Sequence, residues 1–331
     1  MISGRAALLA AALALPALAS PALPALTLAD EVAAITSQNA DRVTLLDATT
    51  LARVAETPLP GKPAAVAVDG PRGRILVVAV DTRRLHVLDA RGVERASHPL
   101  PGAPFGVAVD PATGQALVTD WEGRLLVVDP VSGAVLRTIA TGAVPSGVAV
   151  TPDGRLAVTA DRDADAISLI DLATGEVTSR VPVGRHPFGV TINGGRAFTA
   201  DVLADTVSVI DLATAEVVAT IPTGERPYAV AFAAGRGFVT NQYGATLTVF
   251  DATALAPLGE VEVGEYPEGI AVTAEGRLLV ANWFDDTVSV VDPVTLDVTD
   301  TLDLPSGPRA FGSFVARMAD QPEGFAALPG Q

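Results

Sequence analysis

Few side chains in this chain of 331 residues could carry out acid–base or nucleophilic chemistry. The chain has three histidines and no cysteine. The absence of cysteine excludes disulfides, thiolate zinc sites, iron–sulfur clusters, covalently attached c-type haem and cysteine nucleophiles. The sequence also contains no Gly-x-Ser-x-Gly nucleophile elbow and no glycine-rich loop for phosphate. We therefore assign no catalytic residue from the sequence.

One set of recurring oxygen-bearing side chains could still take part in chemistry, by binding a metal ion. An Asp or Asn recurs at the ends of short apolar runs, at Asp81, Asp120, Asp161, Asp201, Asn241 and Asn282. A ring of such oxygens could hold calcium, with Glu268 as a further ligand and His186 as the acid/base of a hydrolase or lactonase. One Asp or Asn per repeat is also what a turn needs. We favour the turn, assign no metal ligand and no cofactor, and keep calcium as the alternative.

The charge balance limits the partners. The formal net charge is −16, from 38 acidic and 22 basic residues. A field of this sign repels nucleic-acid backbones and anionic membrane surfaces. We expect no nucleic-acid partner, and no membrane binding once a signal peptide is removed.

The elements that must position these residues follow a repeat. The triplet Pro, any residue, Gly or Ala occurs in seven copies spaced by 40 to 42 residues, beginning at Pro63, Pro104, Pro145, Pro187, Pro227, Pro267 and Pro308. An Asp that closes an apolar run follows the same period, at Asp47, Asp89, Asp129, Asp171, Asp211, Asp251 and Asp292. Because a short Asp side chain accepts hydrogen bonds from backbone amides two residues later, these seven Asp are interpreted as turn residues.

Each repeat is predicted to contain four strands. In the copy that starts at Pro187 they are expected at 188–192, 196–200, 206–210 and 216–221. The segment Thr-Val-Ser-Val-Ile at 206–210 alternates as a half-buried strand does. Four-stranded units at this period are typical of propeller blades.

The two markers are out of phase at the chain ends, since Asp47 precedes the first triplet and no Asp follows the last. The segment 30–60 is therefore expected to supply three outer strands, and 308–316 the missing innermost strand, of one shared blade. Such closure removes two exposed sheet edges. The fold class predicted is all-β: a seven-bladed β-propeller of four-stranded blades over 30–316, closed by this shared blade.

Several segments resemble the YVTN-type β-propeller repeat. They are Val239-Thr240-Asn241, Thr206-Val207-Ser208-Val209-Ile210-Asp211 and Ala219-Thr220-Ile221-Pro222-Thr223-Gly224. No copy has the full Tyr-Val-Thr-Asn, and several carry Asp at the Asn position. The resemblance implies the fold over 30–316. It implies no single function, because the family includes binding proteins and surface proteins and, more distantly, resembles propellers of quinone-cofactor dehydrogenases.

Residues 1–29 have the pattern of an export signal. Arg5 is the only charged side chain before Asp30, and an unbroken apolar run follows it at 6–15. Cleavage is expected after Ala19, with Ala29 as the second choice. We expect the mature protein to lie in the periplasm, and residues 317–331 to form a disordered tail.

The middle residue of each triplet is where one propeller can differ from another. These residues are Ala64, Phe105, Ser146, Phe188, Tyr228, Glu268 and Arg309. With residues expected on the same face, they give the predicted ligand-binding set: Phe105, Trp121, His186, Phe188, Arg226, Tyr228, Glu268, Trp283 and Arg309. The alternative, which we favour, is that Glu268 and Arg309 pair and the aromatic side chains plug the channel.

The sequence thus predicts an exported binding or scaffold protein, a monomer, that uses the channel mouth for a small ligand or a periplasmic protein. We expect it not to be an enzyme. Two alternatives stay open: the calcium-assisted hydrolase or lactonase, and an accessory protein of a quinone-dependent periplasmic oxidation pathway.

Overall fold

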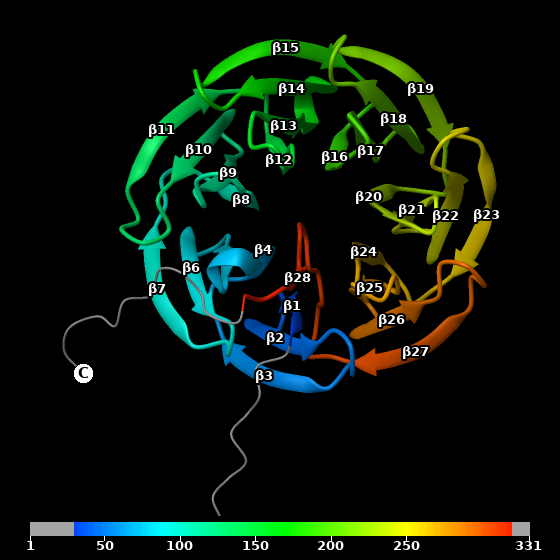
Figure 1. Ribbon diagram of the computed structural model, residues 1–331, viewed down its shortest axis with the longest axis horizontal. Helices are drawn as coiled ribbons and strands as arrows, with labels where there is room; N and C mark the ends of the chain where they lie inside the picture. Colours follow the sequence, from blue (N-terminus) through cyan, green and yellow to red (C-terminus); the bar gives the residue numbers. More distant parts are fainter. Residues whose placement is uncertain (1–29, 320–331) are drawn as a thin grey trace, which may run out of the picture.

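The computed structural model describes residues 30–319, which form seven four-stranded antiparallel sheets arranged radially around a central channel (Figure 1). The predicted seven-bladed β-propeller is confirmed. Among the described residues, no helix has the length and hydrophobicity that a membrane span requires. The predicted signal peptide at 1–29 lies outside the described residues, as do residues 320–331 of the predicted tail.

Six blades are continuous in sequence, and their strands run from the channel outward. The innermost strands are β4 (Pro63–Asp69), β8 (Pro104–Val109), β12 (Pro145–Val150), β16 (Pro187–Asn193), β20 (Pro227–Ala233) and β24 (Pro267–Val272). The second strands are β5 (Arg74–Ala79), β9 (Ala116–Asp120), β13 (Leu156–Asp161), β17 (Arg196–Asp201), β21 (Arg236–Asn241) and β25 (Leu278–Asn282). The third strands are β6 (Arg84–Asp89), β10 (Arg124–Val128), β14 (Ala166–Asp171), β18 (Thr206–Asp211), β22 (Thr246–Asp251) and β26 (Thr287–Val291). The outermost strands are β7 (Glu94–Pro99), β11 (Val135–Ala140), β15 (Glu176–Pro182), β19 (Glu216–Pro222), β23 (Pro257–Glu262) and β27 (Val298–Asp303). Two 3-10 turns interrupt the connections, η1 (Gly70–Arg72) and η2 (Arg162–Ala164).

The seventh blade is shared between the chain ends. Its order from the channel outward is β28 (Val315–Arg317), β1 (Glu31–Ser37), β2 (Arg42–Asp47) and β3 (Arg53–Pro58). The predicted closure is confirmed, but the innermost strand is broken. Pro308 forms a single bridge with Ser37, and regular pairing resumes only at β28. The segment between them, 310–314, turns into the channel, where it is seen in red at the centre of Figure 1.

The middle strands are buried on both faces, which differs from the half-buried strand that the alternation predicts. Val207, Ser208, Val209 and Ile210 of β18 are all buried. The reason is that a blade has a neighbour on either side, so both sheet faces become interior. The polar position does not face water. Ser208 Oγ instead donates a hydrogen bond of 2.7 Å to the Asp201 carboxylate in the adjacent strand.

The seven Asp that close the third-strand runs are turn residues, as predicted. At Asp251, Oδ1 accepts from the backbone N–H of Thr253 at 2.8 Å and of Ala254 at 2.7 Å. These amide donors stabilise the ionised carboxylate and lower its pKa below the usual value. The pKa values of Asp171, Asp211 and Asp292 are lowered for the same reason.

Candidate functional site

The innermost strands approach one another closely at the third triplet position. A Cβ placed on Gly189 would overlap the carbonyl oxygen of Tyr228 in the next blade, and a Cβ on Gly147 would overlap that of Phe188. Only a residue with no side chain, or a very small one, fits there. The seven triplets therefore bring their middle residues together at one end of the channel. We call the face at this end, which carries the loops between second and third strands and between blades, the triplet face.

Aromatic side chains fill the channel at the triplet face. Phe188 lies 5.5 Å from Phe105, 4.5 Å from Tyr228 and 5.3 Å from Phe311, measured between ring centroids. All four rings are buried, and we call them the aromatic plug. Burial of the Tyr228 hydroxyl raises its pKa. Three of the four rings belong to the predicted set, and they pack on one another rather than line an open mouth.

Phe311 was missed by the sequence analysis, although the repeat contains a signal for it. The residue three positions after the triplet proline is Val66, Val107, Val148, Val190, Val230 or Ile270 in the first six copies and Phe311 in the last. Its place in the plug depends on the inward turn of segment 310–314, where Ala310 has a left-handed φ of 48° and Gly312 a φ of 118°. This path has no counterpart in the other six copies, so repeat arithmetic does not predict it.

Glu268 and Arg309 form a buried ion pair beside the plug. Arg309 Nε lies 3.0 Å from Glu268 Oε2, but the N–H is not directed well enough at the oxygen for a hydrogen bond. Glu268 Oε1 accepts from Gln242 Nε2 at 3.0 Å, and Arg309 donates to Gln38 Oε1 at 2.9 Å and to the Tyr228 hydroxyl. The pairing that the sequence suggested is therefore present.

Burial controls the titration of this pair. Removal of Glu268 from water raises its pKa to about 7, and the positive charge of Arg309 and the hydrogen bond from Gln242 offset part of that rise. Burial lowers the pKa of Arg309. The nearby Glu268 and Tyr228 raise that pKa by more than burial lowers it, so Arg309 stays charged.

The two tryptophans extend the aromatic surface beyond the plug. Trp121 stacks on Phe105 at 4.7 Å, and the Arg162 guanidinium lies 4.9 Å from the Trp121 ring. Trp283 lies on the other side, 5.9 Å below the Arg309 guanidinium. Both rings are half-buried.

A second aromatic group continues outward from Trp283, and the sequence analysis did not identify it. The ring centroid of Tyr266 lies 5.5 Å from that of Trp283, 4.6 Å from that of Phe284 and 5.7 Å from that of Tyr243. We call Tyr243, Tyr266, Trp283 and Phe284 the aromatic ladder. Tyr243 is 58% exposed and Phe284 is 64% exposed. They are the two exposed aromatic side chains among residues 30–319, and both lie in this one group.

His186 and Arg226 occupy equivalent positions on the triplet face, each directly before a triplet proline. Both have left-handed backbone conformations, with φ of 60° and 59°. Their amides donate to the Asp165 and Asp205 side chains at 2.8 and 2.9 Å. Burial lowers the pKa of His186, and the Arg226 guanidinium lies 5.4 Å from the Tyr243 ring.

Five of the six recurring Asp and Asn, all except Asp81, are buried and serve their own blades. Asp120 Oδ1 accepts from the backbone N–H of Ala103 at 2.8 Å, and Asn241 Nδ2 donates to the Thr248 hydroxyl at 2.9 Å. Burial raises the pKa of Asp201 to about 6. These side chains hold the loops of the triplet face in place.

One member of the predicted ring is wrong. Asp81 does not occupy the position of Asp120, because Pro63 pairs with Ala79 where Pro104 pairs with Asp120. Ala79 thus takes the ring position, and Asp81 lies two residues further along the loop. The error arose because loop length varies between repeats, and sequence spacing alone cannot show which residue faces the proline.

The residues that a calcium-assisted hydrolase would need have separate partners. Asn282 Nδ2 donates to Thr287 and Ser289 in its own blade, at 3.0 and 2.8 Å. Glu268 is occupied by Arg309 and Gln242. His186 Nδ1 has Asp163 Oδ1 as its neighbour, at 3.9 Å. Within residues 30–319 no cluster of three His, Asp or Glu side chains is arranged to hold a metal ion.

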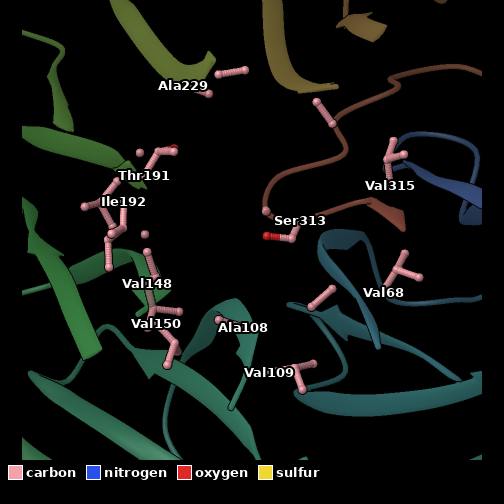
Figure 2. A pocket seen from close by; sticks show the side chains of 18 of the residues that line it. Val68, Ala108, Val109, Val148, Val150, Thr191, Ile192, Ala229, Ser313 and Val315 are labelled. Carbon is pink, nitrogen blue, oxygen red and sulfur yellow. The ribbon is translucent and has the colours of Figure 1, made fainter. Parts of the chain in front are cut away.

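The opposite end of the channel is open. A cavity of about 600 Å³ lies there, lined by the second halves of the innermost strands and by segment 311–313 (Figure 2). Its wall carries mostly small apolar side chains, among them Ala108, Val109, Val148, Val150, Ile192 and Ala229. We call it the open cavity. No residue of the predicted ligand-binding set lines it.

Comparison with known proteins supports the fold alone. No protein-family model matches the chain, and no curated protein matches it. The hydrazine synthase of Kuenenia stuttgartiensis is similar in structure, with a TM-score of 0.67, 19% identity, and coverage of 77% of this chain and 90% of that one. A functionally unknown protein from Desulfotomaculum acetoxidans gives a TM-score of 0.72 at 13% identity, covering 84% of this chain and 99% of the other.

Proposed function

We propose that this chain is an exported binding or scaffold protein that holds a protein partner on its triplet face. The observation that carries the proposal is the aromatic ladder. In a chain with only 5% aromatic residues, both exposed aromatic side chains of residues 30–319 belong to one contiguous group beside the channel.

The form of the triplet face favours a macromolecular partner over a small enclosed ligand. The plug fills the channel mouth, and Phe105, Phe188 and Tyr228 are each less than 8% exposed. Beside it, Phe284 and Tyr243 project from loops that the buried Asn282 and Asn241 anchor. Exposed aromatic rings beside a filled channel mouth are typical of a protein interface, where Tyr, Trp and Arg contribute most of the binding energy.

Cationic side chains support the same reading. Arg226 lies over Tyr243 and Arg162 over Trp121, which orients the two rings. Arg162 also pairs with Asp163, with Nε 2.9 Å from Oδ1. Such cation–π pairs contribute roughly 0.5–1 kcal/mol each at exposed sites. A partner with apolar side chains would complement the exposed rings of this surface.

Export remains a prediction from residues 1–29. The apolar run at 6–15 and the small residues around Ala19 support it. Expression in a Gram-negative host, followed by mass measurement of the periplasmic product, tests it. A product that starts at Ser20 or Asp30 supports export, and full-length protein retained in the cytoplasm contradicts it.

Photo-crosslinking tests the partner site. A benzophenone amino acid is introduced at Tyr243 or Phe284, with Val294 as the matched control. Val294 is 65% exposed and lies in a turn between a third and a fourth strand, on the face opposite the ladder. We expect the same partner to be crosslinked from 243 and 284 in host cells, and not from 294. Equal crosslinking from all three positions, or none from the ladder, would overturn the proposal.

A Tyr243→Ser, Phe284→Ser double variant sharpens the test. Loss of two exposed aromatic anchors should weaken partner binding at least tenfold, since hot-spot residues contribute roughly 2 kcal/mol or more each. The thermal midpoint should stay close to that of the wild type, because surface substitutions usually change stability by about 0.5 kcal/mol or less.

A further inference from the structure

The wall of the open cavity carries two charged side chains, and they pair with each other: Arg72 Nη1 is 3.3 Å from Asp69 Oδ1, and Asp69 also pairs with Arg74 at 2.8 Å. The other lining residues are mostly Gly, Ala, Val and Ile, with three prolines and two phenylalanines; the polar side chains among them are Thr191, Asn193 and Ser313. The volume of about 600 Å³ lies within the usual range for ligand sites, roughly 300–1,000 Å³.

Backbone groups give this wall its polarity. The strands β4, β8, β12, β16, β20 and β24 are each the last strand of their sheet on the channel side. An edge strand leaves alternate N–H and C=O groups unpaired. The free side of each innermost strand faces the channel, so backbone groups of these strands are placed to pair with a segment inside the cavity.

The structure shows which groups point inward. The N–H groups of Val66 and Val68 donate to the carbonyls of Phe311 and Ser313, at 2.8 and 2.9 Å. The carbonyl oxygens of Val66 and Val107 both lie beside Gly312. The carbonyl of Val230, which is equivalent to Val66 in the repeat, accepts from Thr191 Oγ1 at 2.7 Å.

One inner edge already pairs with another segment of this chain. Residues 311–313 run parallel to β4, with a bridge between Ala65 and Phe311, and Ser313 projects into the cavity (Figure 2). The inner edge of β4 therefore pairs with another backbone segment inside the channel, although that segment is bent at Gly312, where φ is 118°. The corresponding edges of β8, β12, β16 and β20 carry no such added strand within residues 30–319.

We propose that the open cavity binds a short, extended, uncharged peptide segment with small apolar side chains, which adds as a strand to a free innermost edge. Backbone pairing supplies the affinity in this mode, and pockets for alternate side chains supply the specificity. Small apolar side chains match the Ala and Val wall, and the absence of an unpaired charge among the lining residues disfavours a charged segment. The site is separate from the aromatic ladder, at the other end of the channel.

The test uses a fluorescein-labelled peptide, Ala-Val-Ala-Val-Ala, blocked at both ends, and fluorescence anisotropy with the mature protein. A second peptide of the same sequence is N-methylated at alternate residues. This change keeps the side chains and removes the amide donors. We expect the methylated peptide to bind at least about tenfold more weakly, because two or more backbone hydrogen bonds are lost.

Ser313→Trp is the variant that fills the cavity, and Thr220→Trp is its matched control. Both positions are exposed, but Thr220 lies on the outermost strand β19. We expect Ser313→Trp to abolish peptide binding and Thr220→Trp to leave it unchanged. The Tyr243→Ser, Phe284→Ser variant should bind the peptide normally, so failure here and failure of the partner site are distinguishable.

Three results would overturn the proposal. Equal binding of both peptides would show an apolar pocket without strand pairing, which suits a small apolar molecule instead. Binding that persists in Ser313→Trp would place the peptide elsewhere. Absence of binding at millimolar peptide would show that the free edges are not a peptide site.

Discussion

The two ends of the central channel are formed by opposite halves of the same innermost strands, and they differ in what fills them. At the triplet face, Phe105, Phe188 and Tyr228 meet Phe311 in a buried cluster. At the other face, the same strands continue as small apolar residues around a cavity of about 600 Å³. The closed end combines large side chains at the middle triplet positions with the inward path of segment 310–314, which carries Phe311.

The two ends of the channel also differ in the polar groups that they contain. The closed end buries a charged pair, Glu268 and Arg309, together with the hydroxyl of Tyr228. The open end exposes backbone amides and carbonyls of edge strands. Buried charges must be paired, which fixes a rigid arrangement, whereas edge amides can accept a new strand. We therefore expect the closed end to support a surface for a partner, and the open end to take a ligand inside.

The largest effect should come from opening the closed end. Phe311→Ala removes the ring that contacts Phe105, Phe188 and Tyr228, at 5.3–5.5 Å between centroids. Substitutions of buried Phe by Ala cost about 3–5 kcal/mol, and urea denaturation should show a loss of that size. Phe284→Ala is the control, with a change of about 0.5 kcal/mol or less because the side chain is exposed. A loss below about 1 kcal/mol in Phe311→Ala would mean that the plug is not tightly packed.

A smaller effect is expected from the buried acid. The pKa of Glu268 is raised from 4.5 to about 7 in the folded protein. Between these values the native state holds a proton that the unfolded state has released. The contribution of Glu268 to the free energy of unfolding is therefore fully present below about pH 4.5 and is lost as the pH rises through about 7. Glu268→Gln should remove that slope, which amounts to roughly 1–3 kcal/mol across the window.

The measurement is the unfolding free energy of wild type and Glu268→Gln from pH 4.5 to 7.5. Only the difference between the two curves is diagnostic, because Asp201, with a pKa of about 6, titrates in the same window. Asp201→Asn is the matched variant. Parallel curves for wild type and Glu268→Gln would show that Glu268 has an ordinary pKa and that Arg309 keeps it ionised.

The smallest effect should come from the Asp residues that close the third-strand runs. Asp251 and Asp292 lie in turns between third and fourth strands, and amide hydrogen bonds lower their pKa below 3.8. Their contribution has the opposite sign to that of Glu268. It is present above about pH 3.8 and is lost as the pH falls through the lowered value.

Acid titration followed by circular dichroism checks this difference in sign. Asp251→Asn should reduce the dependence of stability on pH below 3.8 and leave the window from 4.5 to 7 unchanged. A change in the upper window instead would contradict the assignment of Asp251 as an ionised turn residue.

The repeat in the sequence determined the number of blades, their four strands, the turn role of Asp251 and its equivalents, and the closure of the ring. These features depend on local chemistry, since a period of about forty residues, alternating apolar runs and short turn side chains act within one blade. The small residue after Phe188 and Tyr228 was also predictable, because crowding at the channel follows from the architecture alone.

Only the tertiary structure decided how the blades meet. It placed Phe311 in the plug, gave Ala79 and not Asp81 the position opposite the triplet proline, gathered Tyr243 and Phe284 from separate blades, and left the open cavity at the other end. Each of these results depends on residues about 40 or more positions apart, or on a loop whose length differs between copies. Sequence spacing records the period of one blade, but the contacts between blades depend on side-chain volume and direction in three dimensions.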